Sequence, residues 1–296
     1  MSAAELLSRL EGLKPCGSNR WRARCPAHGS KSQTLAIRIG SNGRPLLHCH
    51  AGCDARRILN AVGLTWRGLL GEPDYLPPMD RGESERFAAI VRNAQAQAKA
   101  EREEAQSAAA HRARDQWGQA GEANPGHPYL IAKGVEPYGL RQAGALLLVP
   151  LTDITGTVWN LQTIAPDGTK RFQKGGRVTG LSCLIGDPGD DPARVLACEG
   201  FATGATLHSE TGAPVYCAMH AGNLKPVALA VRSRYPDADI VICGDDDRHT
   251  EGNPGRTAAT AAAEAIGGRV CFPTFGPGER GSDFNDLANL RRRAVA

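Results

Sequence analysis

Residues 240–247 read Ile-Val-Ile-Cys-Gly-Asp-Asp-Asp. The first four are apolar or small and predict a buried strand, and three carboxylates follow the glycine without a break. Three acids at the end of one strand repel one another unless a cation neutralises them, and Mg²⁺ suits such a group of oxygens. Residues 195–200, Val-Leu-Ala-Cys-Glu-Gly, repeat the pattern and end in Glu199 and Gly200. Two buried strands that end in acids predict a metal-dependent phosphoryl-transfer site.

Strand and helix signals alternate around these two stretches. Strands are predicted at 194–198, 214–218, 239–243 and 269–272, and helices at 202–210, 224–234 and 256–266. This alternation predicts an α/β domain with a central parallel sheet. Ligands of such sheets bind at the carboxyl ends of the strands, where Glu199 and Asp245 are expected. Asp245 and Asp247 lie two residues apart in an extended segment, so they point to one side and Asp246 points away.

The charge of the chain is unevenly distributed. The 296 residues, enough for about two domains, carry a net charge of +4. Residues 1–70 hold eleven Lys/Arg and three Asp/Glu, which gives +8 there and −4 in the remainder. The basic N-terminal segment indicates a polyanion partner, and the acidic remainder indicates a bound metal. The alternative for the basic segment is a charged face that is merely solvated. The chain has no apolar run long enough for a membrane span and no signal-peptide pattern at its start, so we expect a cytoplasmic location.

The composition predicts an α+β multidomain protein with four segments. Residues 1–70 are predicted to form a small zinc-ribbon-like domain, and residues 71–120 a connector. The connector begins with a break at 73–78, and its stretch 84–119, rich in Ala, Glu, Arg and Gln, is predicted to be an exposed helix. Residues 121–190 are rich in β structure, with strands at 146–151 and 158–164. Residues 191–296 form the metal-binding α/β domain.

Two short-spaced pairs of metal-ligand residues lie near the N-terminus. Cys25-Pro-Ala-His28 and Cys49-His-Ala-Gly-Cys53 flank an insert, 32–45, that is predicted to form a β-hairpin with its turn at 41–43. Three thiolates and one imidazole suit a tetrahedral Zn²⁺, and four protein ligands make such a zinc structural. The neighbouring His48 and His50 and the distant Cys16 are not expected to be ligands, and His50 remains the competing candidate.

Basic residues accompany both predicted metal sites. Arg22 and Arg24 flank the zinc ligands, and with Trp21 they suit single-stranded nucleic acid, although Trp21 packing on the zinc knuckle is the alternative. A basic loop, Lys170, Arg171, Lys174 and Arg177, precedes the acidic domain and is expected to hold nucleotide or template phosphates, with an exposed charged turn as the alternative.

The five remaining cysteines lie in or near apolar runs without the spacing of a disulfide framework. They are Cys183, Cys198, Cys217, Cys243 and Cys271. We expect buried thiols that act as small hydrophobic residues.

These motifs together resemble a known family. Glu199-Gly200 followed by Asp245-x-Asp247 is similar to the Toprim signature, and the cysteine–histidine segment resembles the CHC-type zinc-binding domain of phage and plasmid DNA primases. His127-Pro-Tyr-Leu, Asp167-Gly-Thr-Lys-Arg-Phe and Asp283-Phe-Asn-Asp-Leu also resemble the cores of those primases. Two departures are the three residues between Cys49 and Cys53, where bacterial primases have two, and Asp246, where Asn is frequent.

The resemblance implies a site and an activity. Glu199, Asp245 and Asp247 would bind Mg²⁺ or Mn²⁺, and Asp283 would support a second ion. The implied activity is synthesis of short RNA primers from ribonucleoside triphosphates on single-stranded DNA, in replication of a phage, plasmid or integrative element. The implied partner is a separate replicative helicase or initiator, since the chain contains no Gly-x4-Gly-Lys-[Ser/Thr] phosphate loop.

Two other classes of function stay open at this point. One is a Toprim-type metal-dependent nuclease or topoisomerase relative, which would cleave DNA without added nucleotides. The other is a non-catalytic single-stranded DNA-binding module, whose binding would survive loss of all three acids.

Overall fold

The computed structural model describes residues 3–17, 19–40, 44–65 and 81–295. The chain divides into two compact units, residues 1–104 and 105–296. No helix among the described residues has the length and apolar character needed to cross a membrane. The break predicted at 73–78 lies outside the described residues.

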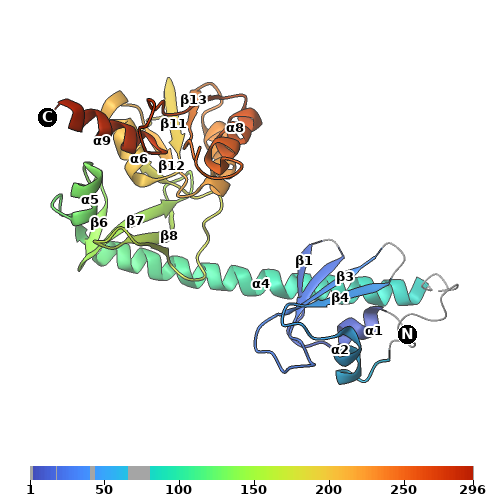
Figure 1. Ribbon diagram of the computed structural model, residues 1–296. Helices are drawn as coiled ribbons and strands as arrows, with labels where there is room; N and C mark the ends of the chain where they lie inside the picture. Colours follow the sequence, from blue (N-terminus) through green and yellow to red (C-terminus); the bar gives the residue numbers. More distant parts are fainter. Residues whose placement is uncertain (1–2, 18, 41–43, 66–80, 296) are drawn as a thin grey trace. The chain divides into compact units, whose positions relative to one another are not determined.

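The first unit is built on an antiparallel sheet of four strands in the order β1-β2-β3-β4 (Figure 1). The strands are β1 (Lys14–Gly17), β2 (Arg20–Ala23), β3 (Leu35–Ile39) and β4 (Pro45–Cys49), with helices α1 (Ala3–Ser8) and α2 (Ala55–Ala61). Leucines of both helices, Trp21 and Ile37 form the core of this unit. The pairing of β3 with β4 confirms the predicted hairpin, whose turn at 41–43 lies outside the described residues.

The long helix α4 (Arg81–Gln119) confirms the predicted helix at 84–119. Its final turns belong to the second unit, where Ala109, Ala110 and Ala113 are buried. Ala113 packs against Leu148 and Leu161 of the adjacent sheet. Small alanine side chains let the helix approach the sheet closely at this end.

That sheet is antiparallel, with the strand order β5-β6-β7-β8-β9. Its strands are β5 (Gly121–Glu122), β6 (Arg141–Ala143), β7 (Leu146–Thr152), β8 (Val158–Ile164) and β9 (Lys170–Phe172), and the short helix α5 (Pro128–Lys133) follows β5. The two long strands confirm the β structure predicted at 146–151 and 158–164. His127 caps α5, because its Nδ1 accepts a hydrogen bond from the Tyr129 N–H at 3.2 Å.

The second sheet of this unit has the strand order β10-β12-β11-β13-β14. Its strands are β10 (Cys183–Ile185), β11 (Arg194–Cys198), β12 (Val215–Cys217), β13 (Asp239–Cys243) and β14 (Arg269–Cys271). The last four are mutually parallel, as predicted, but β10 pairs antiparallel with β12. The central parallel sheet is thus confirmed, and β10 is an additional edge strand, which was not predicted because a three-residue strand carries too little pattern to show which sheet it joins.

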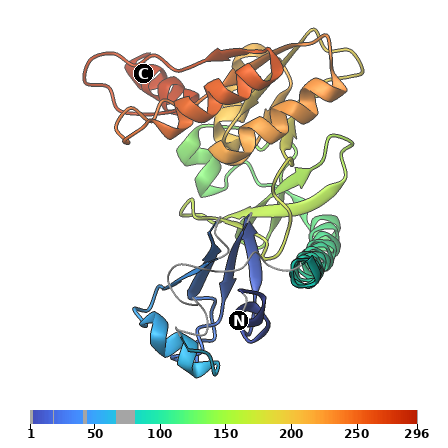
Figure 2. The same ribbon diagram turned by 90° about the vertical axis from the view of Figure 1, so that its right-hand side faces the viewer.

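Helices cover both faces of this sheet. They are α6 (Phe201–Thr211), α7 (Leu224–Arg234), α8 (Pro254–Ile266) and α9 (Phe284–Val295), with the 3-10 turn η1 (Ala221–Asn223) before α7. Helices α7 and α8, side by side in Figure 2, bury their apolar residues on one face, and α6 packs on the other. The first three helices confirm those predicted at 202–210, 224–234 and 256–266. The βα alternation brings the carboxyl ends of β11 and β13 to one edge of the sheet.

Candidate functional site

The structure brings the four predicted zinc ligands together. The ligand atoms of Cys25, His28, Cys49 and Cys53 all lie within 4.8 Å of one another. His28 Nδ1 lies 3.1 Å from Cys53 Sγ and 3.8 Å from Cys49 Sγ. Cys25 and His28 come from the turn after β2, whereas Cys49 ends β4, so the sheet register sets the distance between the two pairs.

The surroundings of the cluster fit a zinc ion. Burial raises the pKa of the Cys25 thiol to about 11. Burial also acts to raise the pKa of Cys49, but hydrogen bonds from the Cys53 and Ala51 backbone and from the Cys25 and Cys53 thiols together lower it to about 7. His28 Nε2 lies 3.4 Å from Thr34 Oγ1, a contact that orients the ring with Nδ1 toward the thiols. A set of three thiols and one imidazole is one that Zn²⁺ prefers.

Two predicted nucleic-acid contacts of this unit lie on different surfaces. Arg22 belongs to the outer face of the sheet, where it lines a hollow of about 450 Å³ together with Arg38 and His48. Arg24 lines a separate hollow of about 710 Å³, in which it lies 3.8 Å from the Glu11 carboxylate. Trp21 is buried in the core, which favours the packing alternative over base stacking.

Glu199 and Asp245 lie at the carboxyl ends of β11 and β13, which are neighbours in the sheet. Glu199 Oε1 and Asp245 Oδ1 are buried and have no hydrogen-bond partner. Burial and then Asp247 raise the pKa of Glu199 to about 7, and burial and then Glu199 raise that of Asp245 to about 8. Two unsatisfied, mutually repelling carboxylates form a site that a cation would stabilise.

The next two acids of the triplet have separate roles. Asp247 Oδ2 accepts a hydrogen bond from the Gly255 N–H at 3.0 Å, at the first turn of α8. Asp246 Oδ1 accepts instead from Asn253 Nδ2 at 2.8 Å and Arg256 Nε at 3.2 Å. The start of α8 therefore holds the side chain of Asp246 as well as that of Asp247.

Asp283 adds a fourth carboxylate from the start of α9. Its Oδ1 accepts a hydrogen bond from the Asp286 N–H at 2.8 Å, which caps the helix. Burial raises the pKa of Asp283 although the hydrogen bond from the Asp286 N–H opposes this shift, and the Asp283 charge in turn raises the pKa of Glu199 and of Asp245. Two residues on, the fully buried Asn285 donates to the Lys133 carbonyl and to Thr206 Oγ1, so this motif also fastens α5 and α6 to α9.

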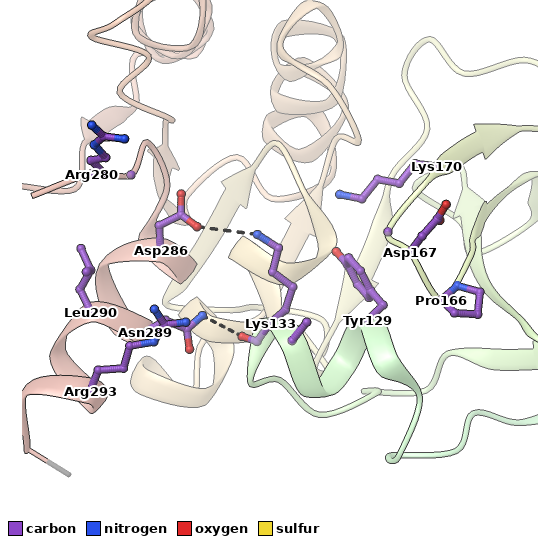
Figure 3. A pocket seen from close by; sticks show the side chains of 13 residues that line it. Tyr129, Lys133, Pro166, Asp167, Lys170, Arg280, Asp286, Asn289, Leu290 and Arg293 are labelled. Carbon is purple, nitrogen blue, oxygen red and sulfur yellow. Dashed lines mark hydrogen bonds and ion pairs between the residues drawn. The ribbon is translucent and has the colours of Figure 1, made fainter.

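A cavity of about 570 Å³ lies between α5, the β8–β9 turn and α9 (Figure 3). Figure 3 shows Lys133 and Lys170 reaching into it on either side of Tyr129, with Arg280 and Arg293 farther along its wall. Burial and then Lys133 lower the pKa of Lys170, and Asp283 and Asp245 oppose this shift. The cavity is therefore a cationic space whose ammonium groups interact with the acidic site.

Sequence reasoning missed Lys133 and the cavity arginines. Tyr129 and Lys133 are four residues apart and therefore share one face of α5, a spacing that could have indicated the lysine. Lys133 Nζ lies 3.7 Å from Asp286 Oδ1. No local signal connects α5 with α9, because the two helices are about 150 residues apart along the chain.

The four residues of the predicted basic loop do not lie together as one cluster. Lys170 and Arg171 belong to strand β9 and therefore point to opposite faces. Lys174 receives a hydrogen bond at its carbonyl from Arg112 of α4, and Arg177 lies 5.2 Å from the ring centre of Trp159. Of these four residues, Lys170 is the one that lines the cavity.

The two candidate metal sites differ in how closed they are. Among the described residues, the His, Cys, Asp and Glu side chains that lie close enough together to hold a metal ion are those of the zinc-type cluster, whose ligand atoms all lie within 4.8 Å of one another. The carboxylates thus do not form a closed cage by themselves. This agrees with Mg²⁺ sites, which take one or two carboxylates and complete their coordination with water and substrate phosphates.

Comparison with known proteins gives matches over both units. Residues 194–294 match the family model of the Toprim domain. A DNA primase TraC of Escherichia coli is 34% identical over 272 residues, which is 87% of this chain and 18% of that protein. Another DNA primase TraC of Escherichia coli is 43% identical over 164 residues, 51% of this chain and 15% of that protein. The chain therefore spans less than a fifth of either relative.

Solved structures also match. The crystal structure of the Aquifex aeolicus primase, zinc-binding and RNA polymerase domains, aligns with 99% of this chain and 82% of its own length. The sequence identity is 15% and the TM-score is 0.41.

Proposed function

We propose that this chain, which carries a Toprim domain and is a homologue of DNA primases TraC, is itself a DNA primase. It makes short RNA primers from ribonucleoside triphosphates on single-stranded DNA. The observation that supports this most directly is the acidic site, where Glu199 and Asp245 each have one buried oxygen without a hydrogen-bond partner beside a cationic cavity. The sequence that carries it is 34% identical to a TraC primase over 87% of this chain. A zinc-type cluster in the same chain agrees with it.

Glu199, Asp245 and Asp247 would hold the catalytic Mg²⁺ or Mn²⁺, with Asp283 beside them. Such an ion, when bound, favours the ionised form of a primer-end hydroxyl and neutralises triphosphate charge. The Gly255 N–H holds Asp247 in place, and Glu199 is followed by Gly200, the N-cap of α6. The chain thus fixes these carboxylates on rigid elements.

Lys133 and Lys170 would bind the triphosphate. Each presents an ammonium group to the cavity, and the charge of Lys170 interacts with Asp283 and Asp245. A cavity of about 570 Å³ has the size of small-molecule sites, which span roughly 300–1,000 Å³. The phosphates would lie between the lysines and the acidic site, so that both ammonium charges offset the anionic charge of the substrate.

The first unit would hold the template. A structural Zn²⁺ held by Cys25, His28, Cys49 and Cys53 would fix the fold of the unit, and Arg22 on the outer face of the sheet would pair with DNA phosphates. A separate helicase or initiator, a cytoplasmic location and a role in a mobile genetic element are further parts of this proposal.

The test is ribonucleotide incorporation on single-stranded DNA of several sequences with Mg²⁺. Glu199→Gln and Asp245→Asn should each abolish oligoribonucleotide synthesis, because each removes one charge from the metal site. Asp246→Asn is the matched control and should stay within a few-fold of wild type, since Asp246 bonds to Asn253 and Arg256 instead. Normal synthesis by Glu199→Gln would refute the proposed site. DNA cleavage without nucleotides, and no synthesis, would favour the nuclease alternative.

A further inference from the structure

Five cysteines form one row across the sheet of the Toprim domain. In spatial order they are Cys183, Cys217, Cys198, Cys243 and Cys271, one on each strand. The register pairs each with the next as direct Cα partners. Partners in register point to the same face of a sheet, and all five side chains contribute to the core beneath α6. We call this set the cysteine row.

Two neighbouring pairs within the row bring their sulfur atoms close. Cys243 Sγ lies 3.5 Å from Cys271 Sγ, and Cys198 Sγ lies 3.8 Å from Cys217 Sγ. Paired strands lie about 4.7–4.9 Å apart, which falls within the Cα separation of roughly 4.4–6.8 Å that disulfides span. Both pairs thus have a backbone spacing that a disulfide tolerates.

The two pairs differ in access and in freedom to move. Strand β14 is an edge strand of three residues, and Cys271 is partly exposed, which corrects the expectation that it is buried. Cys198 and Cys217 are fully buried on strands that have neighbours on both sides. The sulfurs of Cys243 and Cys271 lie 3.5 Å apart and an S–S bond is about 2.05 Å long, so the two side chains and the strands that carry them must approach each other. Of these two pairs, Cys243 and Cys271 can approach without displacing a third strand, because β14 has no neighbour on its outer side.

We propose that Cys243 and Cys271 form a reversible disulfide when the protein is exposed to a peroxide. The Cys271 thiolate attacks hydrogen peroxide, which gives a sulfenic acid and hydroxide. The Cys243 sulfur then attacks the Cys271 sulfur, an S–S bond forms as the S–O bond of the sulfenic acid breaks, and the sulfenic hydroxyl leaves with the Cys243 thiol proton as water. Both sulfurs are oxidised by one electron each, and the peroxide is reduced to two waters. Two equivalents of a thiol reductant return the dithiol.

The order of these steps follows from the two environments. The hydrogen bond with the Cys243 thiol lowers the pKa of Cys271, burial opposes this effect, and the charge of Arg269 adds to it. Cys271 is therefore both the more accessible and the more acidic sulfur of the pair, which suits the residue that reacts first. Cys243 then resolves the sulfenic acid from 3.5 Å away.

Trypsin separates the two sulfurs into single-cysteine peptides, 235–248 and 270–280. After hydrogen peroxide treatment, alkylation of free thiols and digestion, mass spectrometry should find these two peptides linked, and dithiothreitol should release them. The matched internal control is peptide 195–232, which contains both Cys198 and Cys217. We expect the edge link to form at least about tenfold faster than the internal one, since oxidation follows thiolate access.

Two cysteine variants, a labelling control and a comparison in urea test whether the fold itself directs the link between Cys243 and Cys271. Cys271→Ser should remove the link, whereas Cys198→Ser should leave it. Dimedone labelling of the exposed Cys16 shows that the oxidant has acted. Recovery of 235–248 and 270–280 as separate alkylated peptides, beside labelled Cys16, would overturn the proposal. A link that forms equally fast in urea would overturn it too, because the fold would then contribute nothing.

Discussion

Gly255 is the second residue of α8 and lies against the acidic site, so Gly255→Ala tests how precisely the acids must be held. A Cβ atom at this position would lie 2.8 Å from the Asp245 carbonyl oxygen and 2.8 Å from Asp247 Oδ2. Ordinary contacts begin at 3.4 Å. Alanine must therefore push the acidic segment away by about 0.6 Å, the difference between these distances.

The effects on stability and activity should differ in size. Overpacking costs about 1–3 kcal/mol, and the better helix propensity of alanine returns up to about 1 kcal/mol. We therefore expect a loss of about 0–3 kcal/mol in the free energy of unfolding. A misplacement of about 1 Å in a catalytic site costs about 10²-fold in rate, so synthesis should fall by roughly 10- to 100-fold.

The assay combines primer synthesis with thermal unfolding. Gly118→Ala in α4 is the matched control, because nothing lies within 4 Å of its Cβ position. That variant should keep full activity and gain about 0.5–1 kcal/mol in stability. Full activity of Gly255→Ala, with an unfolding temperature equal to that of wild type, would refute the argument that the helix start positions the acids.

Three further predictions concern stability and metal content. Atomic absorption should find one zinc ion per chain. Because structural zinc supplies folding energy to small domains, Cys25→Ser or a strong chelator should unfold the first unit, whereas the second unit should keep its thermal transition. Asn223→Ala should cost about 2–4 kcal/mol in the free energy of unfolding by urea, because the buried amide donates to the carbonyls of Leu181 and Ala218 and accepts from the Gly180 N–H, at about 1 kcal/mol each. A loss below the cost of one hydrogen bond would contradict this. Arg269, and then Arg194, lower the pKa of Asp239 in the folded protein. The ionised Asp239 carboxylate therefore stabilises the fold above its unfolded-state pKa, and this stabilisation is lost as pH falls through the lower folded-state pKa. The difference in unfolding temperature between wild type and Asp239→Asn should shrink as pH falls below about 4, and a constant difference would refute the linkage.

Local patterns in the sequence were sufficient for the elements of the second sheet. Ile240 to Cys243 is an apolar run bounded by charged and turn residues, and such a run forms a strand because its side chains must leave water. Helix α8 was predictable from small and apolar residues at helical spacing. The short strand β10 was not predicted, since its antiparallel pairing depends on which distant strand has a free edge.

The zinc-type cluster was also predictable, for a related reason. Cys25 and His28, like Cys49 and Cys53, are close in sequence, so each pair is local, and one hairpin brings the pairs together. Alternation along an extended strand would place Arg22 and Arg24 on one face, but β2 ends at Ala23, before Arg24. Beyond that residue the turn alone decides where the Arg24 side chain lies.

The sequence by itself determined which residues end the parallel strands, and therefore that Glu199, Asp245 and Asp247 would share one edge of a sheet. Only the tertiary structure decided what surrounds them. It placed Lys133 of α5 and Lys170 of β9 in one cavity beside these acids, and it aligned the cysteines of five strands in a single row. The physical reason is that strand and helix signals act over a few residues, whereas these contacts join segments that pack together only when the whole core forms.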